Sequence, residues 1–185
     1  MRGAAKSDGF RVESGARGDY SAVCRLLDLL DDVHRCRVPW LFRDTDGQPR
    51  TRDEYRALIA DPDSTVLVAR SAPAAVSDAA AAEARAEAPD VIGVVLALVR
   101  STPDFPVFVP ARFGVIDNLV VAPECRRLGI GRALSDAAAV WAKSRGAAWI
   151  ELGVYEFNEE ARRFYEALGY QTLTRKLVKP LPGTG

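Results

Sequence analysis

The residues most suited to chemistry are two closely spaced glycines, Gly129 and Gly131, which follow a pair of arginines. Glycine has no Cβ, so the backbone at such a position can bend sharply and approach a ligand closely. If a helix begins here, its first N–H groups and the positive end of its dipole favour an anion. The nearby cations are Arg126, Arg127 and Arg132. The pattern R-x-x-G-x-G therefore predicts a turn that binds a pyrophosphate.

Two other phosphate-binding motifs do not fit these residues. The dinucleotide-binding fingerprint GxGxxG needs a third small residue and lies directly after its strand, whereas the third position here holds Leu134. A P-loop needs lysine and then serine or threonine after its last glycine, whereas Arg132 and Ala133 follow Gly131. The remaining interpretation is a phosphate-binding turn between a strand and a helix.

The elements that position this turn can be predicted from their side-chain patterns. Residues 113–121 (FGVIDNLVV) are rich in β-branched side chains and predict a strand that leads into the turn. From Ile130 onward, apolar side chains recur at helical spacing, which predicts a helix that starts with the turn. Residues 148–155 (AWIELGVY) predict a second strand, and residues 158–168 predict a short helix that a glycine ends.

The N-terminal part of the chain predicts two more helices. Asp19 is expected to cap the first, in which apolar residues follow at helical spacing. Thr51 and Glu54 form the T-x-x-E pattern of a capping box at the start of the second. Further strands are predicted at residues 9–14, 64–70, 91–100 and 171–179.

This order of elements predicts a single α/β (α+β) domain, residues 1–185, with helices on the faces of a mixed sheet. Residues 72–90 are alanine-rich and bracketed by prolines, so a mobile insertion is expected there. Residues 101–112 mix prolines with apolar side chains and predict an apolar loop, and residues 180–185 predict a loose tail.

The composition excludes several classes of partner. The 25 basic residues balance the 25 acidic ones, so net charge gives no support for a nucleic-acid partner. No apolar run reaches the roughly 18 residues of a membrane span, and the first residues lack the apolar stretch of a signal peptide. The three cysteines lie far apart, which argues against a disulfide framework or a zinc site. A cytoplasmic protein without a membrane partner or a metal is therefore expected.

Two blocks of sequence, IDNLVVAPECRRLGIGRAL and IELGVYEFNEEARRFYEALGY, resemble the GCN5-related N-acetyltransferase (GNAT) family. The resemblance covers residues 113–170 closely and the N-terminal strands more weakly. It implies a mixed, mostly antiparallel sheet of six to seven strands, with helices on both faces and a splayed central pair of strands. It also implies that acetyl-CoA is the co-substrate and that an amine accepts the acetyl group.

The resemblance further implies where the coenzyme binds. In that family the pantetheine arm lies between the splayed strands, here 115–121 and 148–155, and bonds the main chain of the first. Amides of the following turn hold the pyrophosphate, and an asparagine and a tyrosine beyond the second strand contact the coenzyme. The implied coenzyme-binding residues are Leu119, Val120, Val121, Arg126, Arg127, Leu128, Gly129, Ile130, Gly131, Arg132, Ala133, Asn158 and Tyr165.

Acetyl transfer to an amine needs a neutral amine and a proton for the departing thiolate. An alkylammonium has a pKa of about 10.4, so only about one in a thousand is neutral at pH 7, and a positioned base overcomes this deficit. Tyr165 lies where relatives place the tyrosine that protonates the thiolate, although its ring could also simply pack. Asp117 is the first candidate for the base, although it could instead orient the amine or pair with an arginine. Glu151 is a second candidate, and Gly153 replaces the catalytic glutamate that some relatives carry.

The acceptor pocket is expected in the N-terminal region, where His34, Trp40 and Phe42 could line it or merely pack. Trp149 is expected to pack on its strand. The acceptor itself stays open between a polyamine, an amino acid, an antibiotic and a protein N-terminus, and a second copy of the chain is a further candidate partner. Two alternatives to an acetyltransferase also stay open: a non-catalytic acyl-CoA-binding regulatory module, and a transferase of a longer acyl group.

Overall fold

The computed structural model describes residues 9–71, 91–179 and 181. The expected insertion at 72–90 and most of the expected tail at 180–185 lie outside these residues. The chain forms two compact units, Met1–Gly153 and Val154–Gly185, and each is described by itself.

The first unit contains a five-stranded sheet in which the strands follow the order of the sequence, β1-β2-β3-β4-β5. The first four strands pair antiparallel with their neighbours, and β5 pairs parallel to β4. The predicted mixed, mostly antiparallel sheet is therefore confirmed. The strands are β1 (Phe10–Ser14), β2 (Ser64–Ser71), β3 (Val91–Ser101), β4 (Arg112–Val121) and β5 (Ala147–Leu152).

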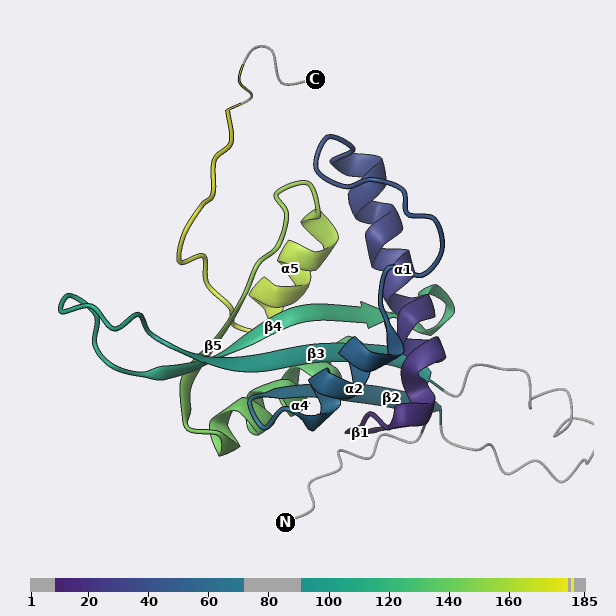
Figure 1. Ribbon diagram of the computed structural model, residues 1–185, viewed down its shortest axis with the longest axis horizontal. Helices are drawn as coiled ribbons and strands as arrows, with labels where there is room; N and C mark the ends of the chain where they lie inside the picture. Colours follow the sequence, from purple (N-terminus) through teal and green to yellow (C-terminus); the bar gives the residue numbers. More distant parts are fainter. Residues whose placement is uncertain (1–8, 72–90, 180, 182–185) are drawn as a thin grey trace, which may run out of the picture. The chain divides into compact units, whose positions relative to one another are not determined.

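Three helices of the first unit, α1 (Tyr20–Arg37), α2 (Arg52–Ala60) and α4 (Ile130–Ser144), cover the sheet (Figure 1). Side chains alternate along β3, so neighbouring residues point to opposite faces. Val94 packs in a buried cluster with α1, whereas a Cβ on Gly93 would point at α4. Helices α1 and α2 thus cover one face, which we call the α1 face, and α4 covers the other. No helix of the described residues is both long and apolar enough to cross a membrane.

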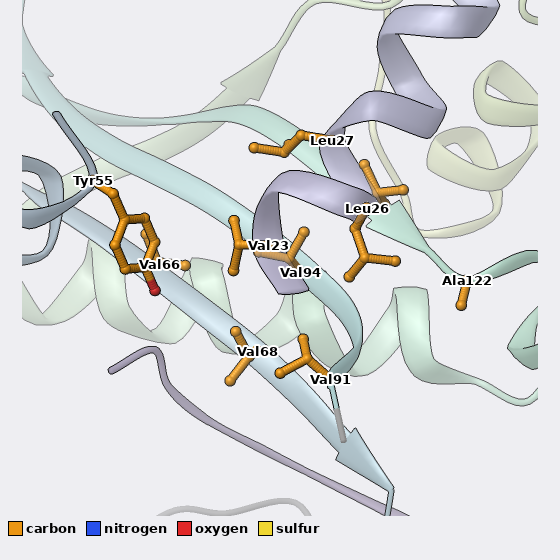
Figure 2. Close-up of a cluster of buried hydrophobic side chains, with 10 residues drawn as sticks. Val23, Leu26, Leu27, Tyr55, Val66, Val68, Val91, Val94 and Ala122 are labelled. Carbon is orange, nitrogen blue, oxygen red and sulfur yellow. The ribbon is translucent and has the colours of Figure 1, made fainter. Parts of the chain in front are cut away.

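The core of the α1 face is a layer of aliphatic side chains between α1 and the two central strands (Figure 2). Leu26 and Leu27 project from α1 toward the valines of β2 and β3. The β-branched side chain of valine packs well on a pleated sheet. The cluster consists of Val23, Leu26, Leu27, Tyr55, Val66, Val68, Val91, Val94, Val120 and Ala122. This layer fixes β3 and β4, the strands that lead to the candidate site.

The expectation of six to seven strands is wrong, because the described residues form five. The missing strand is the one predicted at residues 171–179, which carry no strand pairing. Its apolar side chains Leu173 and Leu177 are 82% and 85% exposed. An alternating pattern gives a segment the propensity for a strand, but the strand forms only where a neighbour pairs with it. In the second unit, the described residues form one helix, α5 (Glu159–Ala167).

The two helix starts predicted from the sequence have different outcomes. At α2, Thr51 accepts a hydrogen bond from the Glu54 amide and Glu54 accepts one from the Thr51 amide, so the capping box is confirmed. At α1, Asp19 makes no side-chain cap, and that expectation is wrong. Its buried carboxylate instead accepts hydrogen bonds from the Ala16 amide and from the guanidinium of Arg70 on β2. A buried carboxylate needs a charged partner, and the arginine outcompetes the helix end for it.

The alkaline stability of the fold should depend on Tyr55. Its hydroxyl donates to the Ala16 carbonyl at 3.0 Å, and burial, reinforced by the Asp19 charge, raises the pKa of Tyr55 to about 12. Because the unfolded tyrosine ionises near pH 10, raising the pH from 10 to 12 favours the unfolded state. We expect the free energy of unfolding to lose about 1.4 kcal/mol by pH 11 through this residue. Urea unfolding at pH 8 and pH 11 measures this loss, and Tyr55→Phe should show a smaller one. An equal loss in both proteins would contradict the assignment.

Candidate active site

The turn between β4 and α4 has the backbone geometry that its glycines predict. Gly129 lies at the N-terminus of α4 with φ of +81°, and Arg127 also has a positive φ, of +64°. A left-handed backbone suits glycine and strains other residues, so the strain at Arg127 marks an unusual turn. A Cβ built on Gly129 would have no atom within 4 Å. The backbone of Gly129 therefore faces open space, as a residue that approaches a ligand must.

The N–H groups at the start of α4 are suited to an anion. In a helix that begins at Ile130, the amides of Gly129, Ile130, Gly131 and Arg132 have no helical carbonyl to bond. The first helical bond runs from the Ala133 amide to the Gly129 carbonyl, at 3.0 Å. The amide of Ala133 is therefore engaged in the helix, and its expected place among the pyrophosphate donors is corrected. We call residues 126–132 the phosphate turn.

The phosphate turn is anchored against the sheet by a buried side chain, and its charged side chains are exposed to solvent. Ile130 is buried, and a Cβ on Gly93 of β3 would lie 3.0 Å from its side chain, so α4 starts close against the sheet. Arg126, Arg127 and Arg132 are all exposed. Arg126 also donates from Nε to the Val121 carbonyl at 3.4 Å, which links the turn to the end of β4. Three exposed guanidinium groups beside free amides fit the two negative charges of a pyrophosphate.

A β-bulge interrupts β4 at Asp117. Leu96 of β3 faces Asn118, and the next residue, Ala97, faces Ile116, so Asp117 has no partner on β3. On the other side, the parallel pairing with β5 ends at Ile116 and Leu152. Beyond this point the described residues give the β5 side of β4 no strand partner. Residues 117–121 thus have no strand partner on the β5 side among the described residues, and we call this unpaired side of β4 the opening between β4 and β5. Leu119, Val120 and Val121, which are expected to contact the coenzyme, lie in this stretch.

The bulge also aims Asp117 at the α1 face. Consecutive residues of a regular strand point to opposite faces, yet Asn118 Nδ2 donates to Asp117 Oδ2 at 2.7 Å. Asn118 faces Leu96, on the α1 face, so the exposed Asp117 carboxylate lies on that face as well. Glu151 of β5 lies on the same face, because it pairs with Val115, two residues before the bulge in β4. The two carboxylates considered as bases therefore share one face.

The second unit holds the other two residues expected to contact the coenzyme. Asn158 caps α5, because its Oδ1 accepts a hydrogen bond from the Ala161 amide at 3.1 Å. Tyr165 is half-buried between the rings of Phe164 and Tyr170, with centroids 5.0 and 5.4 Å away. Burial, with a smaller effect of Tyr170, raises the pKa of Tyr165 to about 12. The hydroxyl of Tyr165 thus keeps its proton at neutral pH.

The residues expected to line an acceptor pocket lie at the C-terminal end of α1 and just after it. His34 stacks on Phe42 with ring centroids 4.9 Å apart, and burial lowers the pKa of His34, so the ring is neutral at pH 7. Trp40 is 68% exposed. The stacking engages His34 and Phe42 with each other, and their place in an acceptor pocket stays a prediction.

Sequence reasoning missed a groove beside the first residues of β4. It has a volume of about 350 Å³ and is lined by the β3–β4 loop, Phe113, Trp149 and Glu151. Trp149 was expected to pack, but it is 42% exposed and stacks on Phe113 across the β4–β5 pair. The apolar loop at residues 101–112 was the signal in the sequence, because apolar loop residues need a surface or a ligand to cover.

Comparisons with known proteins agree with this geometry. The sequence model of the acetyltransferase (GNAT) family matches residues 36–170. A solved structure of a tetramutant of the BH1408 protein from Bacillus halodurans is 26% identical, with a TM-score of 0.76 over 92% of this chain and 99% of that one. A search of the curated proteins found no match.

Two more distant structures share the fold. An aminoglycoside acetyltransferase from an uncultured soil metagenomic sample, solved with sisomicin, is 16% identical with a TM-score of 0.61, over 93% of this chain and 96% of that one. Glucosamine-6-phosphate N-acetyltransferase from Arabidopsis thaliana is 14% identical with a TM-score of 0.62, over 92% and 97%. The family match covers most of the chain, and the bulged β4 with its phosphate turn lies inside it. The chain belongs to the GNAT acetyltransferase family.

Proposed function

We propose that the protein is an acetyl-CoA-dependent N-acetyltransferase that moves an acetyl group directly to a primary amine. The observation that carries this proposal is the phosphate turn at the end of a strand that parts from its neighbour at a bulge. Such a strand offers main-chain groups to an extended ligand, and the turn offers charge to its phosphates. The family generally uses acetyl-CoA as co-substrate, and two structural relatives are named as acetyltransferases of amino sugars or aminoglycosides.

The coenzyme would be held by three parts of this chain. The amides of residues 129–132 and the exposed arginines would bind the pyrophosphate. The main chain of residues 119–121 would bind the pantetheine arm, and Asn158 and Tyr165 of the second unit would contribute further contacts. When bound, acetyl-CoA supplies an acetyl group activated as a thioester.

The residues of this chain would supply the proton transfers. Asp117 is exposed on the α1 face, and Asn118 occupies only one of its carboxylate oxygens. The other oxygen can accept a proton from the incoming ammonium, directly or through water. The neutral Tyr165 can donate a hydrogen bond to the sulfur that departs. Holding both substrates together would supply much of the remaining acceleration as effective molarity.

Thiol release from acetyl-CoA, measured against a panel of amines, tests this proposal. We expect the thiol to be released only when a primary amine without an acidic group is present, and mass spectrometry should then find the acetylated amine. Propionyl-CoA and butyryl-CoA, run in parallel, test whether a longer acyl group is preferred. Tight binding of acetyl-CoA without transfer to any amine of the panel would contradict the proposal and favour a regulatory acyl-CoA-binding module.

A further inference from the structure

The groove beside β5 has an aromatic floor. Phe113 of β4 and Trp149 of β5 stack with their rings 5.3 Å apart and nearly parallel, at 2°. Phe108 and Val109 of the β3–β4 loop, which extends beyond the sheet (Figure 1), also line the groove. The volume of about 350 Å³ lies in the range of small-molecule sites. An apolar or aromatic group of modest size fits such a space.

Among the described residues that line the groove, Glu151 is the charged one. The indole Nε1 of Trp149 donates to Glu151 Oε2 at 3.2 Å, which orients the carboxylate and leaves its other oxygen available. The hydroxyl of Thr102 is already bonded to the main chain of the loop. Arg112 is engaged by a carboxylate and a carbonyl elsewhere, and Arg100, opposite Phe113 on β3, does not line the groove. A carboxylate on an aromatic floor is complementary to an organic cation.

The groove adjoins the opening between β4 and β5. Glu151 lies beside Val115, and the strands stop pairing one residue later, at Ile116 and Leu152. Because the bulge turns Asp117 to the same face, the carboxylates of Glu151 and Asp117 lie one after the other along that face. An amine held by Glu151 would therefore lie next to the place where the proposed function requires it.

We propose that this groove binds the acceptor, a small primary amine with an aromatic or bulky apolar body. The body would lie against Phe113 and Trp149, and the ammonium would bind Glu151 before it passes to the opening at Asp117. That the bound amine is the acetyl acceptor rests on the proposed function, but the binding of the cation can be measured without any transfer. Large polar amines are excluded as substrates, because they would leave the aromatic floor exposed.

Calorimetry with three probes tests the groove. We expect 2-phenylethylamine to bind more tightly than ethanolamine, which lacks the aromatic body, and than 2-phenylethanol, which lacks the charge. Glu151→Gln should weaken 2-phenylethylamine about tenfold, which is about 1.4 kcal/mol, and leave 2-phenylethanol unchanged. Trp149→Leu should weaken both aromatic probes. Asp104→Asn is the matched control, because Asp104 belongs to the same loop but lines a neighbouring hollow.

The outcomes separate the groove from the proposed function. No measurable binding of 2-phenylethylamine, or equal binding to wild type and Glu151→Gln, would overturn the groove even if acetyl transfer to another amine is found. Binding that follows the expected pattern without any transfer would support the groove as an amine site and contradict the enzyme. Thermal unfolding of each variant shows that the compared proteins are folded.

Discussion

Replacing Tyr165 by phenylalanine is expected to lower kcat about 100-fold and to leave the affinity for acetyl-CoA nearly unchanged. The variant keeps the ring that packs between Phe164 and Tyr170 and removes only the hydroxyl. General acid catalysis contributes about 10²–10⁴-fold, and the low end applies because water can replace the donor. Steady-state kinetics with the acceptor amine measures kcat, and calorimetry with coenzyme A measures the affinity.

The raised pKa of Tyr165 restricts how it can act. With a pKa of about 12, it is a weaker acid than a thiol, whose pKa is about 8.5, so complete proton transfer to the thiolate would cost about 5 kcal/mol. We therefore expect Tyr165 to donate a hydrogen bond, and to pass its proton only as another arrives from the amine. Because Tyr165 stays protonated well above pH 10, the variant and the wild type should have kcat profiles of the same shape between pH 7 and 10.

Tyr170→Phe is the control for this prediction, since it removes a neighbouring hydroxyl and keeps the ring contact with Tyr165. It should retain nearly normal kcat. A normal kcat in Tyr165→Phe would remove the residue from the mechanism and leave the phosphate turn unaffected, because other residues form that turn. A kcat that falls above pH 9 in the wild type alone would show that Tyr165 ionises far below the expected pKa.

The phosphate turn could be predicted from the sequence because its causes are local. A strand, two glycines and the start of an apolar helical pattern lie within twenty residues, and each acts through its own backbone. The structure adds the positive φ of Arg127 and Gly129 and corrects one donor, Ala133. That correction is local too, since the fourth amide of a helix is the last without a helical partner.

The bulge and the groove could not be predicted, because they depend on which residues face each other across the sheet. Nothing in FGVIDNLVV marks Asp117 as the residue without a partner, since the shift appears only against Leu96 and Ala97 of β3. In the same way, Trp149 has the alternation of a packed strand residue, and only the pairing with β4 brings it to Phe113. The segment 171–179 shows the reverse error, a strand pattern for which the structure provides no pairing.

Long-range charge pairing likewise lies beyond a sequence pattern. Asp19 precedes a helix and fits a cap, but Arg70, 51 residues later, takes its carboxylate. The energy of a charge-assisted hydrogen bond in a buried site exceeds that of a cap at a helix end. Local preference therefore gave the right helix and the wrong role for its first residue.

Replacing Gly129 by leucine is expected to weaken the binding of coenzyme A at least tenfold. The side chain would project from a backbone with φ of +81° into the open space that no atom of the described residues fills within 4 Å of its Cβ. If the pyrophosphate binds there, the new side chain keeps it away from the helix amides, and both hydrogen bonds and dipole attraction are lost. Calorimetry with coenzyme A and with the wild type as reference measures the change.

The substitution also strains the backbone, and this effect must be separated from the loss of binding. Gly146, at the other end of α4, has φ of +82° and likewise no atom within 4 Å of a built Cβ. A leucine at either position costs roughly 1–2 kcal/mol of stability, because both side chains enter the left-handed region. Gly146→Leu should therefore unfold at a similarly lowered urea concentration yet bind coenzyme A as the wild type does. If the two variants lose stability equally and only Gly129→Leu loses affinity, the loss arises at the phosphate turn. Equal affinity in both would show that the pyrophosphate binds elsewhere, since the strain is matched and only the place of the side chain differs.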